Sequence, residues 1–162
     1  MLLLGLIVLA LSLKASATWN VKKDKLNDWT NDTLFAEASA GQGILLTCCD
    51  MHLIQLRTRR PVLLDGGGLD LLPYTLEAGP EMNRILREVY GIDLFDPPEE
   101  AKGGGRIPRM INKTLWESRT PEQWKEIKKH FGVTDIMMYA DWHLKLPEVI
   151  RNQEFVLYRI SE

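Results

Sequence analysis

The chain has 162 residues, which is enough for one domain with a sizeable core and too few for two comfortable ones. Hydrophobic residues make up 45% and charged residues 26%, and both signs are interspersed around a net charge of -2, which excludes nucleic acid as an expected partner. The two cysteines, Cys48 and Cys49, are adjacent, so a disulfide framework is also excluded, because a bridge between neighbours is very strained.

The N-terminal segment, residues 1–17, is strongly hydrophobic. Residues 1–13 are apolar apart from Gly5 and Ser12, and residues 15–17, Ala-Ser-Ala, match the pattern of a signal peptidase site. This segment is a signal peptide without the usual positive start, or the end of a membrane helix of a longer protein; a buried core helix is a third interpretation. The first two predict a membrane-associated chain with an extracytoplasmic domain, residues 18–162, which is exported if residues 1–17 are cleaved.

Helices and strands then alternate along the chain. Residues 19–40 predict one or two short amphipathic helices, with Asp32 capping the second. Residues 43–68 predict a βαβ unit, with apolar runs at residues 44–48 and 62–64 around a helical segment at 51–58. Both runs are continuously apolar, as expected of parallel strands that are covered on both faces.

The second half predicts two further helices and two further strands. An apolar stripe between Pro80 and Gly91 predicts one helix, and a capping box at Thr120 predicts another that ends at Gly132. Between them, residues 101–108 with three glycines predict a mobile surface loop. Residues 133–140 predict a third buried strand, and residues 155–160 predict a final strand, antiparallel at an edge.

Together these elements predict an α/β fold: a small three-layer, mostly parallel, Rossmann-like sheet with helices on both faces and an antiparallel edge strand. An apolar N-terminal helix is expected to precede it. Residues 18–162 are expected to form a single soluble domain.

Polar residues follow each predicted strand, where ligands bind in open α/β sheets. They could serve as general acid and base, or equally as helix caps and turn residues. The catalytic candidates are Asp50, His52, Asp65, Asp141 and His143. The spacings typical of metal sites are absent, so neither a metal nor a cofactor is assigned. A catalytic use would bring Asp65, Asp141 and a histidine within about one metal-ligand shell of each other.

The triglycine segment after the second predicted strand suggests a phosphate loop or a plain flexible turn. Its spacing fits neither of the usual nucleotide-binding fingerprints. Residues expected at a ligand site are Asp65, Gly66, Gly67, Gly68, Asp70 and Trp142.

Two groups of reactive or charged residues have alternative interpretations. Cys48 or Cys49 could be a nucleophile beside a histidine, although small buried hydrophobic residues are the other interpretation. Arg57, Arg59 and Arg60 could bind phosphate, or could complement the dipole of a helix end.

The order of elements resembles a known kind of domain. The residues that carry the resemblance are the apolar start and the runs at residues 43–47, 59–64, 131–138 and 155–160. It resembles the soluble C-terminal domain that follows the last membrane helix in bacterial polytopic proteins similar to GT-C glycosyltransferases. Because the catalytic carboxylates of that family lie in membrane-helix loops outside this sequence, the resemblance implies no catalytic residue here.

The resemblance implies a membrane-tethered or exported accessory domain, the non-catalytic tail of a glycosyltransferase-like membrane protein. Its expected partners are the membrane, through the N-terminal segment, and a glycan, a lipid-linked sugar or a partner protein. The alternative is a self-sufficient exported hydrolase, metal-dependent or not, that uses the strand-end Asp and His residues. The sequence fixes neither a substrate nor an oligomeric state.

Overall fold

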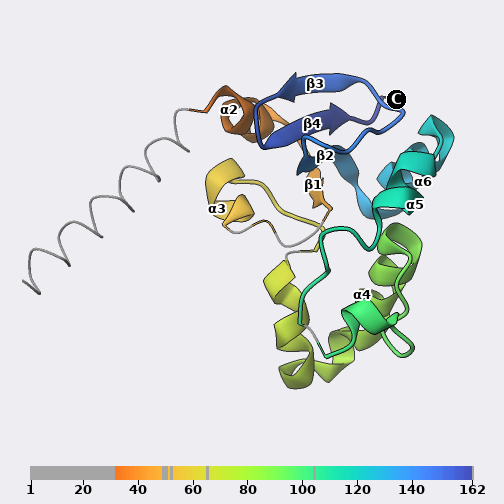
Figure 1. Cartoon of the computed structure of the whole chain (residues 1–162). Coiled ribbons are helices and arrows are strands. Elements are labelled where there is room, and N and C mark those ends of the chain that lie inside the picture. The colour runs from red at the N-terminus through yellow and green to blue at the C-terminus, as the bar shows by residue number, and fades with distance from the viewer. Residues whose placement is uncertain (1–31, 49–50, 52, 65, 104, 162) are drawn as a thin grey trace, which may run out of the picture.

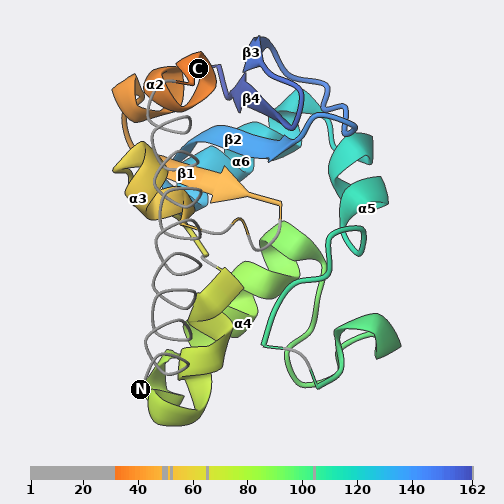
Figure 2. The same ribbon diagram turned by 60° about the vertical axis from the view of Figure 1, so that its left-hand side comes forward.

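The computed structural model describes residues 32–48, 51, 53–64, 66–103 and 105–161. The apolar segment of residues 1–17 lies outside these ranges, and so does the first part of the predicted helical region at residues 19–40. Within the described ranges, no helix combines the length and the apolar character needed to cross a membrane. The sheet lies at one end of the molecule, and a lobe of short helices lies below it in both views (Figure 1, Figure 2).

In the part of the chain that the structure describes, short helices connect and flank four strands. The first half contains α2 (Thr33–Ala40), β1 (Ile44–Thr47), α3 (Ile54–Thr58), the 3-10 helices η1 (Gly66–Tyr74) and η2 (Leu76–Ala78), α4 (Gly79–Ile85) and the π-helix η3 (Leu86–Tyr90). The second half contains the 3-10 helix η4 (Glu99–Ala101), α5 (Lys113–Ser118), α6 (Pro121–Phe131), β2 (Val133–Tyr139), β3 (Glu148–Arg151) and β4 (Phe155–Arg159).

The sheet is mixed, with strand order β1-β2-β4-β3. β1 runs parallel to β2, with Thr47 opposite Met137, whereas β4 is antiparallel to both β2 and β3. The predicted α/β class is confirmed, but the prediction of a mostly parallel sheet is wrong. Among the described residues, one of the three strand pairs is parallel, because β4 lies between β2 and β3 and runs against both of them.

Two strand predictions need correction. The run at residues 62–64 forms only an isolated parallel bridge from Val62 to Leu45, because the chain turns into η1 soon afterwards. β4 is not the edge strand. β3, which the sequence did not predict, occupies that edge, and its half-exposed residues give no apolar run to recognise.

Buried side chains pack against both faces of β2. Its consecutive residues Ile136, Met137 and Met138 all have zero exposed surface, although neighbouring side chains of a strand point to opposite faces. On one side Phe35 of α2 packs edge-on against Phe155 of β4, with ring centroids 6.0 Å apart.

An aromatic cluster fills the other part of the core. The Trp116 ring lies between the rings of Tyr90, Trp124 and Trp142, with centroid distances of 5.4 to 6.0 Å. All four side chains are nearly or completely buried, and edge-to-face aromatic pairs stabilise beyond the area that they bury. Trp142 is therefore part of the core.

Local helix signals are confirmed. Asp32 accepts a hydrogen bond from the Leu34 amide and caps α2, and Thr120 forms the predicted capping box with Gln123 at the start of α6. Gly91 and Gly132 end their helices with φ of 70° and 71°, where glycine is favoured. The triglycine segment does not form a plain turn, because it is the start of the nine-residue 3-10 helix η1.

A buried ion pair links the segment after α3 to β2 at the centre of the sheet. The Arg60 Nη1 atom lies 2.7 Å from Asp135 Oδ2, and the two side chains are 4% and 1% exposed. The remaining Arg60 nitrogens donate to the carbonyls of Gln42 and Gly43 and to the Thr134 hydroxyl. Of the two interpretations of this arginine group, Arg60 fits neither, because its guanidinium is used inside the fold.

Candidate ligand-binding site

A cavity of about 370 Å³ lies between η1 and the segment at residues 101–108, here called the glycine-rich loop. Its walls are mostly apolar, and two charged residues, Asp70 and Arg106, stand among the residues that line it. The apolar part comes from Leu69, Pro73, Leu86, Ile92, Leu94 and Ile107. This size and composition match ligand pockets, which typically measure about 300–1,000 Å³ and combine apolar walls with a few polar groups.

The π-helix η3 and the turn that follows it form the back wall. Leu86 begins η3 and receives a hydrogen bond from the Ile92 amide after the Gly91 cap, so both buried side chains are held at one place. The Leu94 amide donates to Asn83 Oδ1 at 2.8 Å, which fixes the next residue of the wall. π-helical segments are rare and occur often at functional sites.

Glycine permits the close approach of the loop to η1. A Cβ atom at Gly105 would lie 1.6 Å from Asp70 Oδ1, so any side chain there would displace the carboxylate or the loop. Gly103 adopts φ of 69°, a conformation that other residues rarely adopt. The Asp70 carboxylate therefore stands against loop backbone at the cavity.

These contacts bring together two segments that the sequence marked separately. Asp70 was a predicted ligand residue, and the loop at residues 101–108 was predicted to be mobile; both now line one cavity. Gly68 belongs to η1 next to it, as do Gly66 and Gly67. Asp65 lies outside the described residues, so its place in the predicted ligand site is not described.

The sheet edge holds the other described candidates. Because β1 and β2 are parallel, their carboxyl ends share an edge, and Asp141, Trp142 and His143 follow β2 there. Asp50 and His52, which follow β1, and Cys49 beside them lie outside the described residues. Among the described residues, no group of three His, Cys, Asp or Glu side chains is placed to hold a metal ion.

Asp141 is ionised and paired at this edge. Its Oδ1 atom lies 2.9 Å from Arg109 Nη2, and Lys113 donates to its backbone carbonyl at 2.6 Å. Desolvation raises the pKa of Asp141, but the hydrogen bond and charge of Arg109 outweigh this effect and hold the pKa below its usual value. A carboxylate held in this way is better suited to an electrostatic or positioning role than to donating a proton.

Trp142 and His143 point to different surroundings. The Trp142 ring has no exposed surface and packs in the aromatic cluster, and its role in a ligand site stays a prediction. The His143 side chain is exposed, and its backbone amide donates to Glu117 Oε1 at 2.9 Å. Cys48, by contrast, is buried in the core, which agrees with the interpretation as a small hydrophobic residue.

Sequence reasoning missed several polar groups at the edge. Asn112 is 1% exposed and donates through Nδ2 to the Cys48 carbonyl at 3.1 Å. Among the described residues, the buried atoms Thr47 Oγ1, Asn112 Oδ1 and Trp142 Nε1 have no hydrogen-bond partner. A buried asparagine far along the chain from the strand that it contacts has no local signature, so no sequence pattern could have identified it.

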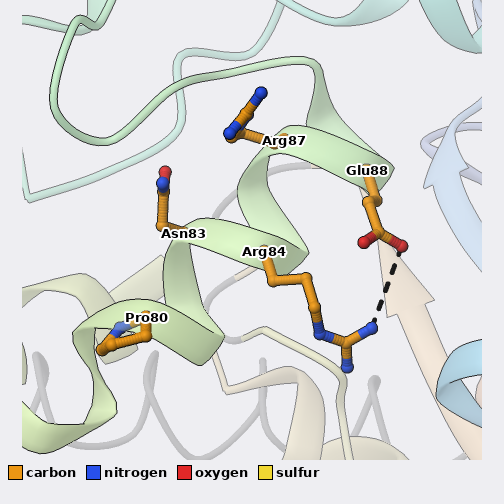
Figure 3. A pocket seen from close by; sticks show the side chains of 5 residues that line it. All are labelled: Pro80, Asn83, Arg84, Arg87 and Glu88. Carbon is orange, nitrogen blue, oxygen red and sulfur yellow. Dashed lines mark ion pairs between the residues drawn. The ribbon is translucent and has the colours of Figure 1, made fainter.

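A wider hollow lies on α4 and η3 and is lined by Pro80, Asn83, Arg84, Arg87 and Glu88 (Figure 3). Arg84 and Glu88 point toward one another, with Arg84 Nη1 3.8 Å from Glu88 Oε2, whereas Arg87 points away. Arg84 also pairs with Glu81 at 2.6 Å. Because its main charges pair with each other and few apolar groups line it, this hollow is a weaker candidate than the η1 cavity.

Comparisons with protein-family models, curated proteins and solved structures gave no match.

Proposed function

We propose that the chain is a membrane-tethered or exported α/β accessory domain, the non-catalytic tail of a glycosyltransferase-like membrane protein. In this proposal, the cavity between η1 and the glycine-rich loop binds a glycan or a lipid-linked sugar. The cavity is the observation that carries the proposal, because its apolar walls and charged residues suit an amphiphilic ligand. The Rossmann-like description and an apolar N-terminal helix remain parts of the same proposal.

The polar side of the cavity provides groups that suit a sugar. The Asp70 carboxylate can accept hydrogen bonds from hydroxyl groups. Gly103 carries no side chain and a Cβ atom there would meet nothing within 4 Å, so a sugar ring can approach the loop backbone closely at this position. A short apolar chain attached to the sugar would contact Leu69 and Leu94.

A cavity-filling variant tests this proposal. Ala101 lines the cavity, and Ala101→Trp would occupy part of its volume. Ala36 is exposed on α2 and provides a matched control, Ala36→Trp. Binding of a water-soluble sugar linked through phosphate to a short isoprenoid would be measured by calorimetry, beside the same sugar without the lipid. We expect Ala101→Trp to weaken binding at least about tenfold and Ala36→Trp to leave it unchanged.

The outcomes separate the alternatives. Equal binding by both tryptophan variants, or no binding of either compound, would overturn the cavity as the site. Binding of the free sugar with the same affinity would favour a glycan over a lipid-linked sugar. Turnover of the compound, abolished by Asp141→Asn and His143→Gln, would instead support the exported hydrolase that uses Asp50, His52, Asp65, Asp141 and His143.

Membrane association is tested separately with the full chain. We expect the chain to co-sediment with lipid vesicles, and a chain that begins at residue 18 to remain in the supernatant. Equal distribution of both would contradict the tethered form of the proposal.

A further inference from the structure

A second groove, the η3–α6 groove, lies between the π-helix and α6 and is distinct from the cavity described above. Its volume is about 460 Å³. Leu115, Ile127 and Phe131 supply apolar surface, Arg87, Glu88, Arg119 and Glu126 supply charge, and the His130 ring also lines the groove.

Arg119 is the unusual member of this groove. It lines the groove and is only 7% exposed, yet no carboxylate among the described residues lies within 4.0 Å of its guanidinium. Its Nη2 atom donates to the Glu88 backbone carbonyl at 2.7 Å, and its guanidinium lies 4.9 Å from the centroid of the Trp124 ring. Nη1 is buried and has no hydrogen-bond partner among the described residues.

Arg60 differs from Arg119 because it has a carboxylate partner. Arg60 is equally buried, and its guanidinium meets the Asp135 carboxylate at 2.7 Å, which offsets its charge. Arg119 meets one carbonyl and one aromatic face, neither of which carries a full negative charge. A buried cation without a counter-ion is costly, so a site of this kind favours the arrival of an anion.

Glu88 and Arg87, two other charged residues of the groove, each lie near a residue of opposite charge. Glu88 lies 3.8 Å from Arg84 and 3.9 Å from His130 Nδ1, and Glu126 lies 3.7 Å from His130 Nε2. Arg87 lies 3.8 Å from Asp93. Burial lowers the pKa of Arg119 to about 10, so its guanidinium remains charged at neutral pH. It is therefore the buried positive charge that the groove leaves without a partner.

We propose that the η3–α6 groove binds a carboxylate carried on a short apolar stem. The carboxylate would pair with the Arg119 guanidinium, whose planar fork suits carboxylate geometry, and the stem would lie on Leu115 and Ile127. A monoanion fits better than a doubly charged phosphate, because Glu88 and Glu126 line the same groove and repel additional negative charge. This site is independent of the proposed sugar site.

Titration with simple anions tests the site on the folded chain. Sodium butyrate, sodium acetate and inorganic phosphate would be compared at constant ionic strength, adjusted with sodium chloride, by side-chain NMR of the arginines. We expect butyrate to shift the Arg119 resonance and to bind more tightly than acetate or phosphate. We expect Arg119→Met to weaken butyrate binding at least about tenfold, since a hydrogen-bonded charge pair is lost.

Two further variants keep the test decisive. Arg151→Met removes an exposed arginine of β3, outside the groove, and we expect it to retain butyrate binding within about twofold. If Arg119→Met does not fold, Arg119→Lys keeps the charge but loses the planar fork, and we expect weaker binding than in the wild type. Wild-type affinity in the Arg119 variant, stronger binding of phosphate than butyrate, or a response centred away from Arg119 would overturn the proposal.

Discussion

Substitution of Asp135 is expected to destabilise the fold more than substitution of any exposed charged residue. Its Oδ2 atom accepts from Arg60 at 2.7 Å and from Thr134 at 3.0 Å, and its Oδ1 atom accepts from Arg159 at 2.8 Å. Asp135→Ala leaves Arg60 buried without a counter-ion. Removal of one partner from a buried ion pair typically costs about 3–5 kcal/mol.

The structure places the cost toward the lower part of this range. Arg60 keeps hydrogen bonds to the carbonyls of Ala38, Gln42 and Gly43, so its nitrogens are not left bare. Arg159 is 45% exposed and can return to water. We therefore expect Asp135→Ala to lower the free energy of unfolding by about 3–4 kcal/mol. For a chain of this size, that corresponds to a fall in Tm of roughly 6–16 °C.

Urea denaturation followed by tryptophan fluorescence would measure this loss, with the m-value checked for constancy. Arg159→Ala is the matched control, because it removes the exposed partner of the same carboxylate and should cost no more than about 1 kcal/mol. The double variant Arg60→Met with Asp135→Leu should be more stable than Asp135→Ala, since no buried charge remains. A loss below about 1 kcal/mol for Asp135→Ala, or an equal loss for Arg159→Ala, would refute this account.

Three further predictions follow from single contacts. A Cβ atom at Gly41 would lie 2.3 Å from Arg60 Nη1, so Gly41→Ala should lower the urea midpoint by an amount equivalent to about 1–3 kcal/mol, and an unchanged midpoint would argue against this contact. Thr47→Val removes a buried hydroxyl oxygen that has no partner among the described residues, so calorimetry should show an unchanged or higher Tm; a clear decrease would reveal an unseen partner. The Arg151 hydrogen bond lowers the pKa of Glu148, so this pair stabilises the fold above about pH 4.5 and loses that effect as the pH falls. Arg151→Gln should therefore slightly reduce the loss of folding stability at acidic pH. Identical dependence of stability on pH in the variant and the wild type would contradict this.

The sequence predicted the parts of the fold that depend on neighbours along the chain. Asp32, the pair of Thr120 and Gln123, and the glycine stops at Gly91 and Gly132 each act within one turn of helix. Their effects need no knowledge of the rest of the molecule. This explains why helix ends were predicted well while strand order was not.

Contacts between residues far apart in the sequence could not be predicted, because they leave no local pattern. Arg60 and Asp135 are separated by 75 positions, and each alone resembles an ordinary surface residue. β3 is half exposed and only four residues long, so it has no apolar run, and its presence at the edge moved β4 inward. The predicted parallel strand at Val62 failed for the related reason that the continuation of a strand depends on where the next turn takes the chain.

The candidate site was also predicted only in part: its residues were noticed in the sequence, but the contact between them was not. Asp70 and the glycine-rich loop were each notable in the sequence, one as a carboxylate behind a predicted strand and the other as a segment with three consecutive glycines. Their meeting depends on the 3-10 course of η1 and on the close approach of the loop, where a Cβ atom at Gly105 would lie 1.6 Å from Asp70 Oδ1. A side chain at that position would displace the Asp70 carboxylate or the loop. Gly105 therefore matters for where the carboxylate stands in the cavity, which no local sequence pattern could indicate.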